Sequence, residues 1–234
     1  NYGITSCGHL SSSTRITLTT CYIDSSNTVI GKTDCLIGVS NSGGLSLTSD
    51  IGLIIGGFTY SGPTDKNEAY RFSTNSWTSR RVKTTNSGGI GGLSFTSDIG
   101  VCSGGNTGGN SVSLKVQGYT YSSDFWVNKK DLPYALDDAQ EISLTTDIGI
   151  IAGGRVGTTY PFGVTNRSLL YSLSTNTWTE MATISISRNE MGSFSLSKNN
   201  GLIYGGVDST TVQNRSEKYT YGIPSFLGFS VLTW

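Results

Sequence analysis

A twelve-residue segment recurs along this chain, and its repetition restricts the possible folds more than any other feature of the sequence. It occurs as SLTSDIGLIIGG at 46–57, SFTSDIGVCSGG at 94–105 and SLTTDIGIIAGG at 143–154, and more loosely as SLSKNNGLIYGG at 195–206. The closing glycine pairs are 48, 49 and 52 residues apart, counted from their first members Gly56, Gly104, Gly153 and Gly205. This spacing predicts an array of similar structural units.

A second marker keeps the same spacing. Its clearest copies run from a tyrosine to a tryptophan: YRFSTNSW at 70–77, YTYSSDFW at 119–126 and YSLSTNTW at 171–178. Two weaker copies are YIDSSNTV at 22–29 and YTYGIPSF at 219–226. The tyrosines therefore fall at positions 22, 70, 119, 171 and 219. Two markers that stay in phase over five copies indicate five units.

Each unit reads as four β-strands. The first is the alternating run at 45–49, and a tight turn at Asp-Ile-Gly follows it; the fourth copy of the segment has Asn199-Asn200-Gly201 there, which tolerates positive φ. The second strand, at 53–55, is apolar throughout, as expected for a strand buried on both faces, and the double glycine ends it. The third strand ends near the tyrosine, and after an STN or SSD turn the fourth begins at Trp77, Trp126 or Trp178. Four-stranded units that cannot bury their faces alone favour radial stacking in a β-propeller.

The double glycine, the tyrosine and the tryptophan, in this order, resemble the Kelch-type repeat. The resemblance covers essentially the whole chain, and it is strongest in the units with Gly56, Gly104 and Gly153. The segment TNTWTEM at 175–181 is also similar to repeats of viral and environmental surface proteins. The resemblance implies a binding or scaffold module more often than an enzyme. We predict an all-β fold, a single β-propeller domain over 1–234 with about five four-stranded blades, at approximately 1–40, 41–88, 89–137, 138–189 and 190–234.

The two ends of the sequence fit this alignment unequally. Gly3 takes the place of Gly52, and Cys7-Gly8 take the place of a double glycine, so the first blade is expected to be incomplete. Phe226 stands where Trp77 stands, so LGFSVLTW at 227–234 is expected to supply the last fourth strand. Five repeats of about 49 residues would need roughly 245 residues, and 234 are present.

Three interpretations of the incomplete blade follow. The tail crosses to the first blade as a closing strand, the missing strand lies outside the sequence, or a neighbouring subunit donates it by strand addition to an open edge. We favour a closed five-bladed ring, completed by the first or second of these. Five blades is low for the family that the chain resembles, so a fragment of a larger ring is the alternative.

Cysteines and sequons offer further predictions. Cys7, Cys21 and Cys35 lie in the first unit, on its expected second, third and fourth strands, and a Cys7–Cys21 disulfide would join adjacent strands; the alternative is four buried thiols. A disulfide would imply an oxidising compartment. Cys102 is expected to be a small hydrophobic residue in a buried strand. Asn166 and Asn214 begin Asn-Arg-Ser sequons on exposed loops, which are acceptors for N-glycans in a secreted protein.

The residue content argues against several classes of function. Only 14% of residues are charged and the formal net charge is zero, so no basic surface exists to bind nucleic acid. No apolar run approaches the roughly 20 residues that span a bilayer. One histidine, His9, excludes sites that need two, including that of a copper radical oxidase of the resembling family. Gly31-Lys32-Thr33 lacks the other features of a phosphate loop and falls on an expected fourth strand. We predict no catalytic residue, no cofactor and no metal.

The repeated aspartates have a simpler interpretation than calcium binding. Asp50, Asp98 and Asp147 each stand alone, without the alternating acidic spacing of a calcium loop, so they are expected to form turns.

The loops carry the remaining candidates for a functional site. Loops after the double glycines and loops between blades are expected on one face of the propeller. Their ligand or partner residues are Phe58, Tyr60, Asn106, Tyr134, Asp137, Tyr160, Phe162, Arg188 and Asp208, accompanied by Asp138, Asn189 and Glu190. Aromatic rings with polar neighbours suit sugar binding, but these loops differ from unit to unit.

Two functions are therefore expected. The first is a non-enzymatic structural subunit of an extracellular or virion-surface fibre, tube or coat, which self-associates through propeller edges and a C-terminal assembly tail. The tail residues are Phe226, Leu227, Phe229, Val231, Leu232 and Trp234. The second is a carbohydrate-binding, lectin-like module that has glycans as its partners.

Overall fold

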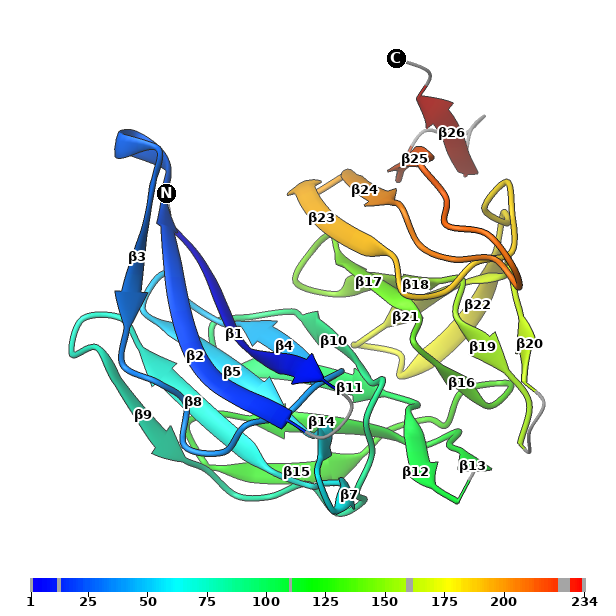
Figure 1. Ribbon diagram of the computed structural model, residues 1–234. Helices are drawn as coiled ribbons and strands as arrows, with labels where there is room; N and C mark the ends of the chain where they lie inside the picture. The colour runs from blue at the N-terminus through cyan, green and yellow to red at the C-terminus, as the bar shows by residue number, and fades with distance from the viewer. Residues whose placement is uncertain (1, 12–13, 110, 159–161, 223–227, 233–234) are drawn as a thin grey trace.

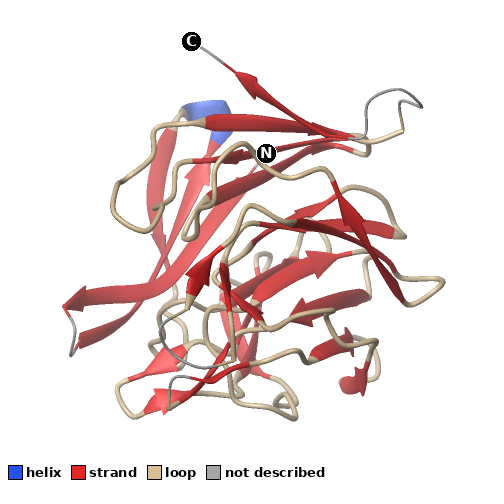
Figure 2. Ribbon diagram, turned by 90° about the vertical axis from the view of Figure 1, so that its right-hand side faces the viewer, coloured by secondary structure: helices blue, strands red, loops and turns tan. Residues whose placement is uncertain are grey.

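Five antiparallel β-sheets of three or four strands form the framework of the described residues, and smaller sheets of two or three strands lie in the loops (Figures 1 and 2). The structure, a computed structural model, describes residues 2–11, 14–109, 111–158, 162–222 and 228–232. Sheet I has three strands in these residues, β1 (Tyr2–Ser11), β2 (Thr14–Ile23) and β3 (Thr28–Lys32), with a short 3-10 turn at Asp24–Ser26. The prediction of an all-β fold built from antiparallel sheets is confirmed.

Sheets II to V each have four strands in sequence order. Sheet II contains β4 (Gly43–Ser46), β5 (Ile51–Ile55), β8 (Asn67–Arg71) and β9 (Ser76–Ser79). Sheet III contains β10 (Gly91–Ser94), β11 (Ile99–Ser103), β14 (Val116–Thr120) and β15 (Phe125–Asn128). Sheet IV contains β17 (Gln140–Ser143), β18 (Ile148–Ala152), β21 (Ser168–Ser172) and β22 (Thr177–Met181). Sheet V contains β23 (Gly192–Ser197), β24 (Asn200–Tyr204), β25 (Ser216–Thr220) and β26 (Gly228–Leu232).

The sheets follow one another in an arc, with sheet I at one end and sheet V at the other (Figure 1). The first strands β4, β10, β17 and β23 lie side by side, and they border a central cavity of about 1020 Å³ that Ile4, Thr5 and Ser6 of β1 also line. The expected ring closure is not seen: among the described residues, no strand pairing joins sheet I to sheet V.

The segment at the end of the chain completes its own sheet. Strand β26 pairs with β25, so the described part of the tail does not cross to sheet I as a closing strand. The register corrects one prediction: Phe229, rather than Phe226, lies opposite Tyr219 as Trp77 lies opposite Tyr70. The loop before β26 is longer than its counterparts, so counting a fixed spacing from the tyrosine selected the wrong phenylalanine; Phe226 itself lies outside the described residues.

Each Asp-Ile-Gly turn is held by hydrogen bonds that recur from sheet to sheet. The Thr48 hydroxyl accepts hydrogen bonds from the backbone N–H groups of Asp50 (3.1 Å) and Ile51 (2.9 Å). The Asp50 carboxylate accepts the Ser73 backbone N–H at 2.6 Å, which lowers the Asp50 pKa and ties this turn to the turn before β9. Asp98 with Ser122 and Asp147 with Ser174 repeat this contact. The interpretation of these aspartates as turn residues is confirmed.

The double glycines are required by backbone geometry. Gly56 has φ 62°, and a Cβ there would overlap the Ser87 carbonyl oxygen of the loop that leads to the next sheet. Cys7 adopts the same left-handed backbone with φ 65°, and the Gly8 N–H donates to the Val39 carbonyl oxygen as the Gly57 N–H donates to Ser87. Cys7-Gly8 therefore occupy the place of a double glycine, as the alignment predicted.

The core forms where one sheet packs on the next. Leu45 of sheet II lies where a Cβ on Gly100 of sheet III would be. Leu93 of sheet III and Gly149 of sheet IV repeat this contact, and so do Ile142 of sheet IV and Gly201 of sheet V. The glycines of the Asp-Ile-Gly turns of sheets III and IV, and of the Asn-Asn-Gly turn of sheet V, are thus sockets for an aliphatic side chain of the preceding sheet. The three side chains that fill these sockets are at most 4% exposed.

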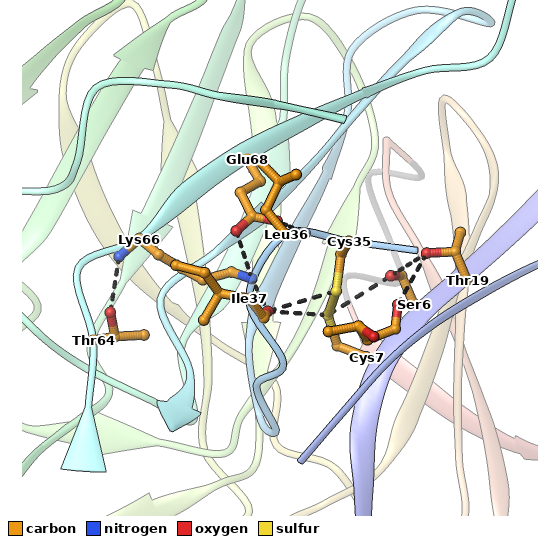
Figure 3. Close-up of polar contacts among 10 residues, drawn as sticks. Ser6, Cys7, Thr19, Cys35, Leu36, Ile37, Thr64, Lys66 and Glu68 are labelled. Carbon is orange, nitrogen blue, oxygen red and sulfur yellow. Dashed lines mark hydrogen bonds and ion pairs between the residues drawn. A yellow bond between two sulfur atoms is a disulfide. The ribbon is translucent and has the colours of Figure 1, made fainter. Parts of the chain in front are cut away.

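The disulfide joins Cys7 to Cys35, not to Cys21 (Figure 3). Cys21 lies opposite Ile4 in the β1–β2 pairing, three residues from Cys7, which is about 10 Å along a strand. Cys35 lies beyond the end of β3, in the segment that passes back toward Cys7, with a Cα–Cα distance of 6.9 Å. Cys21 and Cys102 are buried free thiols, and burial raises the pKa of Cys102 to about 12.

Candidate functional site

A repeated clasp fastens sheets II, III and IV each to the segment that leaves the preceding sheet. In sheet II, the Asn75 side-chain oxygen accepts hydrogen bonds from the Tyr70 hydroxyl (2.8 Å) and from the backbone N–H of Thr33 (3.0 Å). The Trp77 indole N–H donates to the Thr33 carbonyl oxygen at 2.8 Å. Asn75 has φ 49°, a left-handed conformation that asparagine tolerates well. One asparagine and one tryptophan thus bind the backbone N–H and the backbone carbonyl of a single residue, Thr33, which follows the last strand of sheet I.

Sheets III and IV repeat this clasp. In sheet III, Tyr119, Asp124 and Trp126 hold the main chain of Arg81. In sheet IV, Tyr171, Asn176 and Trp178 hold the main chain of Lys130. Sequence reasoning treated the STN and SSD segments only as turns and missed this role. The signal was present in the constant five-residue step from the tyrosine to the asparagine or aspartate.

A buried polar contact supplements the clasp between the first two sheets (Figure 3). Glu68 accepts the Leu36 backbone N–H at 3.0 Å and forms an ion pair of 3.2 Å with Lys66, whose amine also donates to the Ile37 carbonyl oxygen. Burial lowers the pKa of Lys66, while Glu68 opposes this shift. Glu217 has the same place in sheet V, where it accepts from Ser185 and from Arg188 (2.5 Å to Nη2).

The predicted functional loops do lie side by side. The loop strand β16 (Leu136–Asp137) pairs with β19 (Arg155–Val156), which pairs with β20 (Gly163–Val164). In sheets II and III, single β-bridges join the corresponding loops, between Ser40 and Phe58 and between Gly88 and Asn106. Two short hairpins complete these loops, β6 (Phe58–Thr59) with β7 (Gly62–Pro63) and β12 (Asn106–Gly108) with β13 (Ser111–Val112).

Four of the predicted loop residues, Asp137, Asp138, Arg188 and Asn189, are buried. Arg188 is completely buried, so its expected exposure is corrected: it donates to the Gly205 carbonyl oxygen and to Glu217 between sheets IV and V. Asp137 is 1% exposed and forms a two-point ion pair with Arg155, 3.1 Å to Nε and 2.8 Å to Nη2. Burial raises the pKa of Asp137 to about 6, although the Arg155 contacts lower it.

Most of the other predicted loop residues have side chains that pack against neighbouring groups or form hydrogen bonds within their own turns. Phe58 lies against Gly88, and guanidinium groups stand over the rings of Tyr134 (Arg167, 3.9 Å) and Phe162 (Arg155, 5.4 Å). The side chains of Asn106 and Asp208 accept backbone N–H groups of their own turns. Tyr60 differs from them with 79% of its surface exposed. Tyr160 lies outside the described residues.

The central cavity has a mixed polar and apolar lining that includes two acids, Asp50 and Glu141. The Ser46 backbone N–H donates to the Ser94 hydroxyl (2.9 Å), Ser94 to Ser143 (2.8 Å) and Ser143 to Ser195 (3.0 Å), so a ladder of serines links four sheets. Glu141 stands at the position that Gly44 and Gly92 have in sheets II and III. Burial raises the pKa of Glu141 to about 8, and the nearby Asp138 adds to this rise.

Apolar side chains are exposed on the two sheets that end the arc. On sheet I, Leu18, Tyr22 and Val29 share one face, whereas Ile4 and Ile30 lie on the other face. On sheet V the exposed apolar side chains are Phe194, Leu196 and Tyr204. The side chains of the predicted assembly tail, 226–234, lie outside the part of the chain for which side chains are described. The uncovered faces of sheets I and V are the candidate assembly surfaces.

The remaining candidate residues lie on loops or in strand β3. Asn214 is exposed and Asn166 is half-buried, both on loops before a third strand, and their glycosylation stays a prediction. Gly31 and Lys32 lie in β3, as expected, with the lysine amine 4.4 Å from the centre of the Phe72 ring. Within the described ranges, no group of three or more His, Cys, Asp or Glu side chains is arranged to hold a metal ion.

Comparison with protein-family models and with curated proteins finds no match for this chain. The described residues also contain no helix with the length and apolar character that crossing a membrane requires.

Proposed function

We propose that this protein is a non-enzymatic structural subunit that self-associates, and that its five sheets are blades of a Kelch-type β-propeller. The repeated strand order and the central cavity support the propeller. The uncovered apolar faces of sheets I and V carry the proposal of self-association. A large exposed apolar surface on a folded protein marks a site of interaction.

The setting that we propose is extracellular, at a cell or virion surface. The Cys7–Cys35 disulfide supports this, because disulfides persist in oxidising environments. Sparse charge and a formal net charge of zero are compatible with close packing of copies, since self-repulsion is small.

Mass measurement over a range of concentrations tests this function. Sedimentation velocity should show species that grow with protein concentration, and electron microscopy of the same samples should show fibres, tubes or sheets of regular width. A single monomeric species at every concentration, with no ordered assembly in images of the native source, would contradict the proposal.

Carbohydrate binding is the second candidate, and the exposed ring of Tyr60 on the loop face favours it. A glycan array with the intact protein, compared with Tyr60→Ala and Tyr160→Ala variants, provides the test. Binding that both variants lose would support a lectin-like site on the loops. No signal from the intact protein would remove this candidate.

A further inference from the structure

We propose that sheet V of one copy docks on sheet I of a second copy in the way that consecutive sheets pack within the chain, with Phe194 seated on Gly3. This inference rests on the proposed assembly function and specifies the partner and the two faces. The interface would be head-to-tail, because the face on sheet V differs from the face on sheet I.

The packing within the chain supplies the template. Three times, an aliphatic side chain from the first strand of one sheet fills the glycine socket of the next sheet: Leu45 at Gly100, Leu93 at Gly149 and Ile142 at Gly201. The aliphatic side chains come one residue before the ladder serines Ser46, Ser94 and Ser143. The residue in the same position of sheet V, before Ser195, is Phe194. Phe194 is therefore the next side chain in the series.

Among the described residues, Phe194 fills no glycine socket of its own chain. It is 54% exposed and stacks on Tyr204 of the same sheet, with ring centroids 5.2 Å apart. Leu196, two residues further on, is 58% exposed, whereas its counterparts Leu47, Phe95 and Leu144 are at most 7% exposed. The same repeat positions are thus buried within the arc and uncovered on its last sheet.

Sheet I presents the complementary empty socket. Gly3 pairs with Tyr22 as Gly100 pairs with Tyr119, so it occupies the socket position, yet a Cβ at Gly3 would meet no atom within 4 Å. Tyr22 is 42% exposed, although Tyr70, Tyr119 and Tyr171 are at most 1% exposed.

Sheet I has the tyrosine and the asparagine of the clasp, with Val29 opposite Tyr22 where sheets II to IV have a tryptophan. Asn27 has φ 51°, and its side-chain oxygen accepts the Tyr22 hydroxyl at 3.1 Å, as Asn75 accepts Tyr70. Among the described residues, no backbone N–H of another sheet reaches Asn27 as Thr33 reaches Asn75. The Asn27 side chain is therefore already held in the position where it could accept a backbone N–H from the sheet of a second copy. This preorganisation keeps the cost of association low.

A second copy is the occupant that fits these two faces. In the single chain, sheets I and V stand at opposite ends of the arc (Figure 1), the Gly3 socket is empty and Phe194 contacts its own sheet. Every copy offers one of each face. Contacts between unlike faces can repeat from copy to copy and produce an open filament or a larger ring.

Two variants block one face each. Phe194→Arg places a charge on the sheet V face and leaves sheet I intact. Gly3→Leu fills the socket and leaves sheet V intact; because the glycine is extended and has open space around it, the monomer should keep its fold. Matched controls are Val212→Arg on an exposed loop and Thr28→Leu in β3, an exposed position on the opposite face of sheet I from Gly3.

Mixing the two variants tests the inference. We expect each variant alone to self-associate roughly tenfold or more weakly than the natural protein in sedimentation velocity, while the controls behave like the natural protein. An equimolar mixture should form a dimer that does not grow further, because Phe194→Arg retains the sheet I face and Gly3→Leu retains the sheet V face.

Other outcomes would overturn it. Assembly that both variants leave unchanged would reject these two faces while keeping the assembly function. Reduced assembly in each variant without the mixed dimer would reject head-to-tail docking. A natural protein that stays monomeric and loses thermal stability in both variants would show ring closure within one chain, and it would contradict the assembly function too.

Discussion

Single polar side chains connect neighbouring sheets, and asparagines in the left-handed region are prominent among them. Asn75 and Asn176 satisfy a buried tyrosine hydroxyl and a backbone N–H of the preceding sheet at once. Few other residues combine this backbone conformation with a side-chain acceptor. A substitution there affects both the turn and the interface between sheets.

We expect Asn176→Gly to lower the free energy of unfolding by about 1–3 kcal/mol. Glycine keeps the left-handed backbone at no steric cost, so the loss isolates the acceptor of the Tyr171 hydroxyl and the Lys130 N–H. The control is Asn41→Gly, an exposed residue with φ 50°, which should change stability by only a few tenths of a kcal/mol. Urea unfolding measures both variants, and equal effects would reject the clasp.

Glu141 should make the stability of the protein depend on pH between about pH 4.5 and pH 8. Its pKa is raised on folding from an ordinary 4.5 to about 8, so folding favours the protonated form. The stability that this proton brings is complete below about pH 4.5 and is lost as the pH rises to about 8. Glu141→Gln, which stays neutral, should therefore match the natural protein at pH 5 and exceed its stability at pH 9 by roughly 1–3 kcal/mol. Parallel stability curves for the two proteins from pH 5 to 9 would exclude this shift.

At the scale of strands and sheets, the repeat made most of the structure predictable. The Asp-Ile-Gly turns, the double-glycine bends and the four-strand order follow from local geometry that each copy repeats, so a pattern read in one unit applies to the next. The place of Cys7 as a double-glycine residue was also predictable, because alignment requires no knowledge of contacts.

What could not be predicted depends on register and on loop length. The choice of Cys35 over Cys21 follows from a three-residue offset between β1 and β2 and from the path of the chain after β3. Phe229 replaced Phe226 because the loop before β26 is longer than in the other units. Arg188 lies on a loop, as predicted, but no local pattern reveals that it is buried there and paired with Glu217, 29 residues away.

The Cys7–Cys35 disulfide should stabilise sheet I in particular. It closes a loop of 28 residues, for which the loss of entropy in the unfolded chain predicts about 3–4 kcal/mol. Joint replacement Cys7→Ala and Cys35→Ala should lower the melting temperature and speed proteolysis between residues 1 and 40. A reducing agent should have the same effect on the natural protein and none on the double variant. Equal proteolysis rates for oxidised and reduced protein would contradict this role.

For the whole molecule, stability should rise from the ends of the arc toward its middle. The main hydrophobic clusters lie in and between sheets II to V. In the strands of sheet I, Cys21 is the one fully buried apolar residue among those whose side chains are described. Amide hydrogen exchange should therefore be fastest in sheet I, slower in sheet V and slowest in β11 and β18. In assembled material, protection should increase in β1 and β23 and stay constant in β11. Uniform exchange over all five sheets would show a single cooperative unit instead.

The serine ladder has a consequence for how such a chain can change in length over evolutionary time. Every rung runs the same way, from the backbone N–H of one sheet to the hydroxyl of the next. A duplicated repeat inserted between two sheets would bring one new donor and one new acceptor, and it would leave no rung unpaired. Deletion of a whole repeat would also leave every remaining donor paired with an acceptor. A gain or loss of part of a repeat would instead leave a donor or an acceptor without its partner. Genes of this type are therefore expected to grow and shrink by entire repeats.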